Sequence, residues 1–302
     1  MKEVIHVKSI SQAHEIFSLN KPKHPLVSIY QHKDIDTNAI PVGIKYSFEL
    51  YHIIFKSGYS GTLQYGRNSY DFQDGTIILT SPGQVVTSGG WHNTVEAKGW
   101  SLLFHPDLIR KSELGKHINS YSFFSYDVHE ALHVSEDEEQ NITELAKKIE
   151  KEYTQNIDRH SQNLIISNIQ LMLDYCIRYY DRQFYTRTNL NKDLVSQFEQ
   201  LLSEYFDSDK VLEIGIPTVK SCGLQLNMSP NYLSDLLKKE TGKNAQEHIH
   251  YFLIEKAKNK LLGTTESVSQ IAFSLGFEYP QHFSKIFKTK TGMSPIEYRN
   301  KN

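Results

Sequence analysis

The side chains best suited to chemistry gather in a short segment near the C-terminus. Apolar residues at Phe283, Ile286 and Phe287 recur at i, i+3 and i+4, which predicts a helix with one buried side. The other side carries amide, imidazole, hydroxyl and ammonium groups, on Gln281, His282, Ser284, Lys285 and Lys288. Such groups hydrogen-bond to the edges of bases and bind phosphate oxygens. Taken alone, the pattern equally fits a small helical bundle with a solvated face.

A second helix is expected immediately before this segment. Ser267 and Gln270 have the spacing of a capping box, and Gly276 suits the left-handed position that follows a helix. Between them an apolar face is formed at i, i+3, i+4 and i+7 by Val268, Ile271, Ala272 and Leu275. Pro280 then suits the first position of the next helix. Two short helices joined by a tight turn are typical of a helix-turn-helix unit.

The same pattern occurs twice. The stretch 219–242 matches 268–292 at an offset of 49 residues in the first helix and 50 in the second, so the additional residue falls in the turn. In the earlier copy, Ser229 is expected to cap the second helix, Pro230 to open it and Gly242 to end it. Its outward residues are Asn231, Ser234, Asp235, Lys238 and Lys239, with Tyr232 at the edge. An internal repeat of this kind indicates one supersecondary unit used twice.

One long helix is predicted between the two units. From Gln246 to Leu262 the apolar residues again fall on one face, and Gly263 ends the pattern. A continuous helix fixes the separation of the units, so that one chain can enter two major-groove segments about one helical turn, roughly 34 Å, apart. A further capping box, at Ser294 and Glu297, opens a closing helix.

Two such units joined by one helix, and ending in GFEYPQHFSKIFKTKTGMSPIEYR, resemble the DNA-binding domain of the AraC/XylS family of bacterial transcription regulators. The resemblance covers roughly residues 193–302, with the units at about 215–242 and 267–292. The family's best preserved positions fall on Ala272, Gly276, Phe277, Phe283, Ser284, Phe287, Lys288 and the stretch 291–295. Two residues depart from the family pattern. Lys285 stands where many members have arginine, which weakens bidentate reading of guanine, and Pro280 has no N–H with which to bind a phosphate.

The resemblance implies which residues of the first unit contact DNA. In the family the early outward residues lie at base edges and the later lysines lie nearer the backbone. Asn231 would then pair with adenine and Asp235 would accept from cytosine N4, while Lys238 and Lys239 would neutralise phosphates. Asp235 would equally serve to reject other bases or to orient a neighbouring side chain.

For the second unit we predict Gln281, His282 and Lys285 at bases and Ser284 and Lys288 at the backbone. The complete predicted DNA-contacting set is Asn231, Tyr232, Ser234, Asp235, Lys238, Lys239, Gln281, His282, Ser284, Lys285 and Lys288.

Charge is distributed unevenly along the chain. The total formal charge of -2 does not suggest nucleic acid. Residues 216–302, however, contain 12 Lys and Arg against 7 Asp and Glu, a net charge of +5, which leaves -7 for the rest. This asymmetry favours a basic module facing DNA attached to an acidic regulatory module.

Length and composition predict two globular domains. The 302 residues are 39% apolar and 12% aromatic, which is enough for two ordinary cores. The apolar runs are far shorter than the roughly 18 residues that span a bilayer, and the first residues lack a signal-peptide core. We therefore expect a cytoplasmic protein with no membrane association. The two cysteines, Cys176 and Cys222, lie on apolar helical faces, which predicts buried free thiols rather than a disulfide.

The first 125 residues are short apolar stretches separated by turn residues. Examples are 26–30, 46–56, 61–65, 76–80 and 99–104. Many short strands at this spacing predict an antiparallel barrel or sandwich. The family resemblance implies a cupin-like β-barrel, a jelly roll that holds a small effector, and we assign it residues 1–130. The predicted fold class is α+β.

The predicted barrel carries no recognisable catalytic or metal site. Metal-dependent cupins present a His-x-His pair, and residues 1–130 contain none. The sequence shows no nucleophilic residue and general base at the spacing of a recognisable catalytic site. We therefore predict no enzyme activity, no catalytic or metal-binding residues and no cofactor. Aromatic side chains supply candidate walls for an apolar or aromatic effector, at Phe48, Tyr51, Trp91 and Trp100. The same aromatics equally serve to fill a barrel.

Residues 131–185 are predicted to form two helices. Ser135 and Glu138 make a capping box that begins an amphipathic helix to about Asn156. The helix over 162–182 is apolar on more than one face and so requires two partners. One partner is the barrel or the preceding helix. The family resemblance implies that the other partner is a second copy of the chain, in an antiparallel dimer. The alternative is that both apolar faces are buried within one chain. The polar stretch 181–192 is expected to be a linker.

These patterns together predict a transcription regulator that binds double-stranded DNA and is controlled by a small molecule. Family analogy adds RNA polymerase as a partner and activation as the outcome. One alternative is a barrel enzyme or small-molecule binder whose helical domain only assembles oligomers. Another is a barrel without a ligand in a protein controlled by its expression or by a protein partner.

Overall fold

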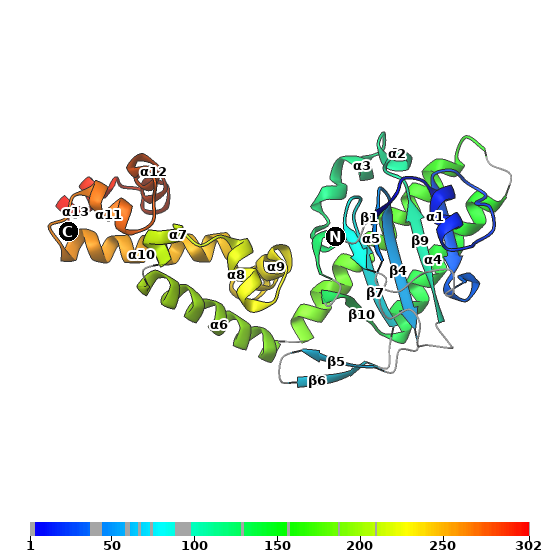
Figure 1. Ribbon diagram of the computed structural model, residues 1–302, viewed down its shortest axis with the longest axis horizontal. Helices are drawn as coiled ribbons and strands as arrows, with labels where there is room; N and C mark the ends of the chain where they lie inside the picture. The colour runs from blue at the N-terminus through cyan, green and yellow to red at the C-terminus, as the bar shows by residue number, and fades with distance from the viewer. Residues whose placement is uncertain are drawn as a thin grey trace. The chain divides into compact units, whose positions relative to one another are not determined.

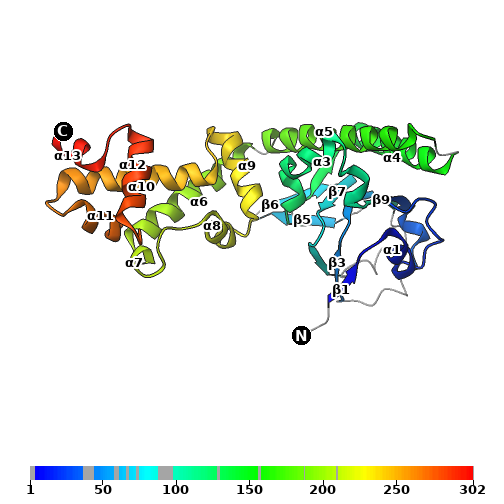
Figure 2. The ribbon, with the colours of Figure 1, turned by 90° about the horizontal axis from the view of Figure 1, so that it is seen from above.

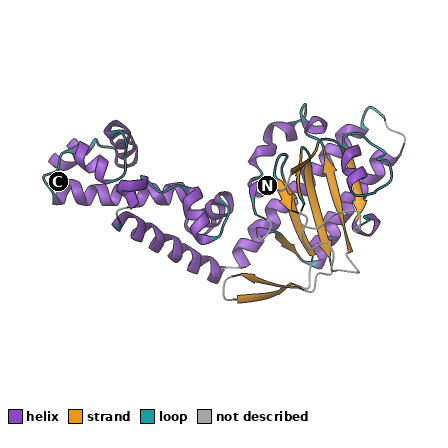
Figure 3. Cartoon of the chain, in the orientation of Figure 1, coloured by secondary structure: helices purple, strands orange, loops and turns teal. Residues whose placement is uncertain are grey.

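The computed structural model describes residues 4–36, 44–57, 61–65, 68–72, 75–87, 98–127, 130–155, 158–186, 188–208 and 210–301. The chain divides into two compact units, Met1–Tyr185 (unit 1) and Thr186–Asn302 (unit 2). The strands gather in unit 1, whereas the described residues of unit 2 form helices and turns (Figure 1 and Figure 3). The chain is therefore α+β, as predicted.

The strands of unit 1 form three sheets. Their bounds are β1 (Val4–Val7), β2 (Val27–Gln31), β3 (Lys45–Phe48), β4 (Tyr51–Ser57), β5 (Gly61–Tyr65), β6 (Asn68–Phe72), β7 (Gly75–Thr80), β8 (Val85–Thr87), β9 (Lys98–Phe104) and β10 (Leu132–Val134). The largest sheet has the order β10-β7-β4-β9-β2, and every pair in it is antiparallel. A second sheet has the order β1-β3-β8, and β5 pairs with β6 in a third.

A closed barrel, which the sequence led us to expect, is not formed by the hydrogen bonds of the described strands. The predicted single strand over 46–56 breaks at Glu49 and Leu50, where the N–H of Glu49 donates to the carbonyl of Val7 at 2.8 Å. Because of this break β3 joins one sheet and β4 another. The parallel pairing of β1 with β3 is a further departure from the predicted antiparallel arrangement.

The two faces of the five-stranded sheet differ in polarity. Along β4, alternate residues point to opposite faces, which separates Ile53 and Phe55 from His52 and Lys56. The face of Ile53 is covered by α4 (Glu136–Thr154) and α5 (Ser161–Thr186), which lie across the sheet in Figure 1 and Figure 2. The face of the five-stranded sheet that carries His52 packs against the small sheet, β1-β3-β8. The core on this face includes Val7, Ile10, Phe17, Tyr30, Tyr46, Phe48, Leu50 and Leu103.

The remaining helices of unit 1 are short and cover its edges. They are α1 (Ile10–Ile16), α2 (Pro106–Ile109), α3 (Glu113–His117) and the 3-10 helices η1 (His32–Asp34), η4 (Ile118–Ser120) and η5 (Ser122–Ser125). The apolar segment 121–126 was predicted to pack beneath the helices that follow it. This is confirmed, because the rings of Phe123 and Tyr180 stack at 5.6 Å and the hydroxyl of Tyr121 donates to Asp174 at 2.8 Å.

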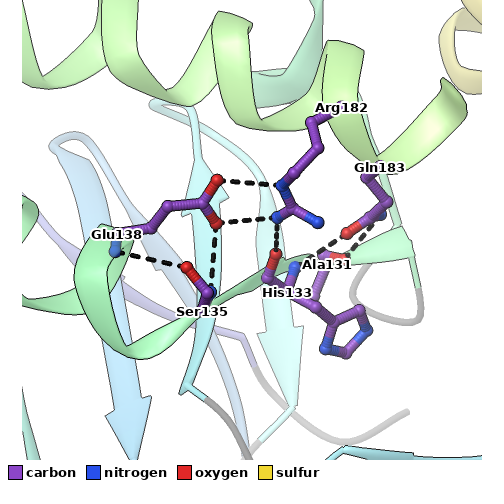
Figure 4. Close-up of polar contacts among 6 residues, drawn as sticks. All are labelled: Ala131, His133, Ser135, Glu138, Arg182 and Gln183. Carbon is purple, nitrogen blue, oxygen red and sulfur yellow. Dashed lines mark hydrogen bonds and ion pairs between the residues drawn. The ribbon is translucent and has the colours of Figure 1, made fainter. Parts of the chain in front are cut away.

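Polar side chains at the C-terminal end of α5 hydrogen-bond to strand β10 and its neighbouring residues (Figure 4). Arg182 donates to both carboxylate oxygens of Glu138, each at 2.8 Å, and to the carbonyl of His133 at 2.6 Å. Gln183 accepts from the N–H of His133 at 2.8 Å and donates to the carbonyl of Ala131 at 3.3 Å. Glu138 belongs also to the predicted capping box of α4, which is confirmed.

The boundary between the two units, at Tyr185 and Thr186, falls within the predicted linker 181–192, but the described residues of this stretch are helical. Helix α5 continues to Thr186, and α6 begins at Thr188. The stretch reads as polar because Arg182 and Gln183 are polar, yet both bind strand β10 and so extend the helix. Sequence periodicity counts only apolar residues and therefore ends the helix too early.

Unit 2 is built from eight helices in its described residues, with α10 lying between two similar pairs. Their bounds are α6 (Thr188–Asp207), α7 (Lys210–Ile214), α8 (Val219–Leu226), α9 (Pro230–Thr241), α10 (Ala245–Gly263), α11 (Val268–Ser274), α12 (Pro280–Thr291) and α13 (Pro295–Lys301). None of the helices in the described ranges of either unit has the length and apolar character needed to cross a membrane.

Candidate nucleic-acid interface

The first candidate recognition helix is α9, and its ends form as predicted. The hydroxyl of Ser229 accepts from the N–H of Tyr232 at 3.3 Å, and Pro230 occupies the first helical position. Gly242 ends the helix with φ +77, a left-handed conformation that other residues adopt only with strain. The inward residues Leu233, Leu236 and Leu237 are fully buried.

The opposite side of α9 presents most of the predicted contact residues. Asn231, Lys238 and Lys239 are exposed, and Ser234 and Asp235 are partly exposed. They follow one another at helical spacing, so they lie on one side of the helix. An amide, a carboxylate and two ammonium groups thus lie on that side of the helix.

Tyr232 does not belong to this exposed side. Its side chain is only 2% exposed, so the prediction that it lies at the edge was wrong. The reason is its position four residues before Leu236, which directs it toward the same core. The buried side of α9 is therefore wider than the positions of Leu233 and Leu236 alone predict.

The second candidate recognition helix, α12, has the same design. It starts at Pro280 and ends at Gly292, which has φ +78. Phe283 and Phe287 are fully buried. The other side presents Gln281, His282, Lys285 and Lys288 as exposed residues and Ser284 as a partly exposed one.

The last turns of the two helices repeat the same hydrogen bonds at an offset of 50 residues. The hydroxyl of Thr241 donates to the carbonyl of Leu237 at 2.8 Å, and that of Thr291 donates to the carbonyl of Phe287 at 2.8 Å. Capping boxes then open α10 at Asn244 and α13 at Ser294. The repeat found in the sequence is therefore a repeat in three dimensions.

Helix α10 carries both units. It has 19 residues, and at about 1.5 Å per residue it is about 28 Å long. Its first turns contact the first unit, since His248 Nε2 lies 2.7 Å from the hydroxyl of Thr241. Its later residues Leu253, Ala257 and Leu261 form one core with α11 and α12. One continuous element thus sets the separation of the two recognition helices.

Two glycines allow the helices to approach closely. A Cβ on Gly223, in α8, would lie 2.6 Å from the carbonyl oxygen of Met228, where the chain turns into α9. A Cβ on Gly276, between α11 and α12, would lie 2.9 Å from the carbonyl oxygen of Val211, and this glycine has φ +84. Both turns therefore need glycine for space, and the second also needs it for its conformation.

The aromatic residues predicted to line one effector site lie in different places. Phe48 belongs to the core beside the small sheet, where its ring is 5.7 Å from that of His52. Tyr51 and Trp100 lie on the opposite, helix-covered face, where Tyr51 stacks on Phe104 at 4.8 Å and Trp100 donates to Thr143 of α4 at 3.1 Å. Trp91 lies outside the described residues. Phe48, Tyr51 and Trp100 are therefore not brought together.

A buried polar row on the face of His52 was not predicted. The hydroxyl of Tyr30 lies 3.2 Å from His52 Nε2, and the hydroxyl of Ser101 lies 2.9 Å from His32 Nε2. Burial lowers the pKa of His52 to about 3, and the charges of His32 and Lys56 contribute to that shift. Burial, followed by the charge of Lys56, lowers the pKa of His32 to about 4. In the sequence, these polar residues alternate with apolar ones along β2 and β4. That alternation could have indicated a polar face of the sheet, but it does not show whether such a face is buried or solvated.

Within the described ranges, no group of three or more His, Cys, Asp or Glu side chains is arranged to hold a metal ion. The two thiols are buried, and burial raises the pKa of Cys222 to about 11 and that of Cys176 to about 12. Neither thiol therefore has the thiolate character of a nucleophile.

Comparison with known proteins places these features in a family. A model described as a helix-turn-helix domain matches residues 224–301. The transcriptional regulatory protein YesN of Bacillus subtilis is 38% identical over 78 residues, which make up 25% of this chain and 21% of YesN. The lactose operon transcription activator of Staphylococcus xylosus is 23% identical over 283 residues, 90% of this chain and 95% of that protein.

Among solved structures, the C-terminal domain of AraT, a response regulator from Geobacillus stearothermophilus, is 30% identical, with a TM-score of 0.32, and the match covers 36% of this chain and 84% of that one. The chain spans about a fifth to a third of the length of the first curated relatives, which are 34% covered at most. Residues 224–301 therefore form a helix-turn-helix domain of the AraC type, which is found in bacterial transcription regulators.

Proposed function

We propose that the protein is a sequence-specific DNA-binding transcription regulator whose two helix-turn-helix units read one DNA site. The observation that carries this proposal is the equivalence of α9 and α12. Each exposes amide, hydroxyl and ammonium groups on the side opposite its core, and α10 holds both at a fixed separation. Bases are read by such groups, and phosphates are bound by the ammonium groups.

The proposed contacts divide by position along each helix. Asn231 and Gln281, next to the first residue of α9 and α12, are proposed to contact bases. Lys238 and Lys288 are proposed to contact phosphates. Tyr232 is left out of the contact set because it is buried. Asp235 is the one acidic member, and it is proposed to select cytosine or to reject other bases.

Removing the two lysines tests the proposal through the salt dependence of binding. Each phosphate contact contributes about 0.9 to the slope of log K against log salt concentration. The double variant K238A/K288A is therefore expected to lower that slope by about 2 and to weaken binding to all sequences alike. Fluorescence anisotropy with a duplex selected from a random pool by the full chain, at four or more salt concentrations, gives the slope.

The matched control is K147A/K148A, which removes two exposed lysines from α4 of unit 1. This control is expected to keep the wild-type slope. An unchanged slope in K238A/K288A, or an equal decrease in the control, would show that the recognition helices are not the DNA-binding surface.

We propose further that two copies of the chain associate through α5. Leu164 and Leu171 stand two turns apart on one side of this helix and are 48% and 45% exposed. Part of the apolar arc seen in the sequence is thus exposed on unit 1. Replacing Leu171 by glutamate is expected to raise the dimer dissociation constant at least tenfold, because it places a charge in an apolar contact. Sedimentation velocity over a range of concentrations measures this, with K147E as control; equal association of L171E and wild type would remove α5 from the interface.

Control by a small molecule held in a cupin-like unit 1 is proposed on the family resemblance and on the two facing sheets. RNA polymerase as a partner is proposed on the family resemblance. Activation as the outcome is proposed because the lactose operon transcription activator of Staphylococcus xylosus is similar over most of both chains. A thermal-shift screen of the full chain tests the effector proposal. An effector is expected to raise the melting temperature and to change DNA affinity; if no compound does both, control by a protein partner is favoured.

A further inference from the structure

The two recognition helices are held at their C-terminal ends in different ways. In α9 the last turn carries Glu240, whose carboxylate accepts from the amide of Asn191 in α6 at 2.8 Å. The next residue, Thr241, contacts His248 of α10 at 2.7 Å. At the equivalent positions of the second unit, 50 residues later, stand Lys290, which is exposed, and Tyr298, whose ring meets that of Phe287 at 5.4 Å.

Asn191 is placed to act on α9 rather than on solvent. It is 2% exposed, although it lies in the first turns of α6, in a stretch whose sequence reads as a polar linker. A buried amide that donates to a carboxylate makes a strong, directional hydrogen bond. Asn191 therefore fixes Glu240 in both distance and direction.

His248 fixes the other side of the same turn. It is 6% exposed, and its ring meets the edge of Phe198 of α6 at 6.0 Å. The last turn of α9 is thus hydrogen-bonded to Asn191 of α6 and to His248 of α10. Contacts at DNA base edges tolerate displacements of only about 0.5 Å. These two hydrogen bonds therefore affect which bases the side chains of α9 can contact.

We infer that Asn191 and His248 are positioning residues for the first recognition helix alone, so that reading of the first half of the DNA site depends on the hydrogen bond from Asn191 to Glu240 whereas reading of the second half does not. This inference rests on the proposed DNA-binding function. It adds that the two units are controlled unequally. A displacement of α6 is therefore expected to act on α9 through Asn191.

The experiment compares N191A, E240A and their double variant in the full chain. The probe is a duplex selected from a random pool by the wild-type chain, together with duplexes that carry single base substitutions in each half of the site. Each single variant is expected to weaken binding to the selected duplex roughly tenfold, the value for loss of a hydrogen bond to a charged group. The double variant is expected to be no weaker than either single variant, because both remove the same interaction.

The conservative variant E240Q keeps an oxygen that accepts from Asn191 and is expected to stay within about threefold of wild type. Discrimination between bases is expected to be lost in the half read by α9 and kept in the half read by α12. A purely structural role would instead weaken both halves and lower the melting temperature, which circular dichroism measures for every variant. E240A provides the same test at a partly exposed position if N191A folds poorly.

Additive effects of the two substitutions, equal loss in both halves of the site, or wild-type binding by N191A would each overturn the inference. If the wild-type chain selects no sequence from the pool, the proposed function itself fails, which is a separate outcome.

Discussion

Replacing Phe283 by alanine is expected to reduce the free energy of unfolding by about 3–5 kcal/mol, the usual cost of deleting a fully buried phenyl ring. Phe283 has no exposed surface, and its ring centre lies 5.4 Å from that of Phe277 and 5.6 Å from that of Phe287. Removing it opens a cavity in the core that α10, α11 and α12 share. Urea unfolding of the full chain, followed by circular dichroism, measures the change.

Two further variants make this measurement specific. Leu233 is the equivalent residue of the first unit and is also fully buried, so L233A is expected to cost about 2–5 kcal/mol. Ile296, on α13, is 60% exposed, so I296A is expected to change stability by less than about 0.5 kcal/mol. F283A as stable as I296A would contradict the packing described for the second unit.

Acidification is expected to destabilise unit 1 strongly. The pKa of His32 is lowered to about 4 and that of His52 to about 3, because burial disfavours the charged imidazole. In the unfolded chain both have a pKa near 6.5, so the unfolded state binds more protons below that pH. The stability contributed by the neutral imidazoles is complete above pH 6.5 and is lost as the pH falls toward 4 and 3.

The size of this effect follows from linkage. Each imidazole lowers the free energy of unfolding by about 1.4 kcal/mol per pH unit within its window. Between pH 6.5 and 4.5 the two together remove up to about 5 kcal/mol, a large share of the stability of an ordinary domain. Thermal unfolding at pH 7.5, 6.5, 5.5 and 4.5 measures the loss.

The variant H52Q keeps a side chain able to hydrogen-bond to Tyr30 but does not titrate. It is expected to show about half the wild-type dependence on pH. H117Q is the control, since His117 is exposed. A pH dependence that is the same in H52Q and wild type would mean that His52 is not the titrating group.

The helical repeat was predictable because local rules decide it. Capping boxes at Ser135, Ser267 and Ser294, proline at the start of α9 and glycine at its end are read directly from neighbouring residues, and all are confirmed. The strands β2, β5, β7 and β9 were located to within one residue for the same reason. Their sequence runs are short, apolar and bounded by turn residues.

Features that depend on distant contacts were not predictable from one sequence. The break between β3 and β4 depends on pairing with β1, far away in the chain. The length of α5 depends on what Arg182 and Gln183 bind, and the burial of Tyr232 depends on how wide the core beside α9 is. Asn191 was dismissed as part of a linker because nothing local shows its partner Glu240. Sequence patterns predict which side of a helix is apolar. Contacts with distant parts of the chain decide which polar residues are buried as well.

The most direct test of the duplicated reading surface is hydroxyl-radical footprinting of the full chain on a duplex that it selects from a random pool. Each chain is expected to protect two adjacent segments whose major grooves lie about one helical turn, roughly 34 Å, apart, because α10 holds α9 and α12 at a fixed separation. Loss of Asn231 should weaken protection of one segment and loss of Gln281 that of the other. Protection of a single segment per chain, or of no defined segment, would contradict two units reading one site.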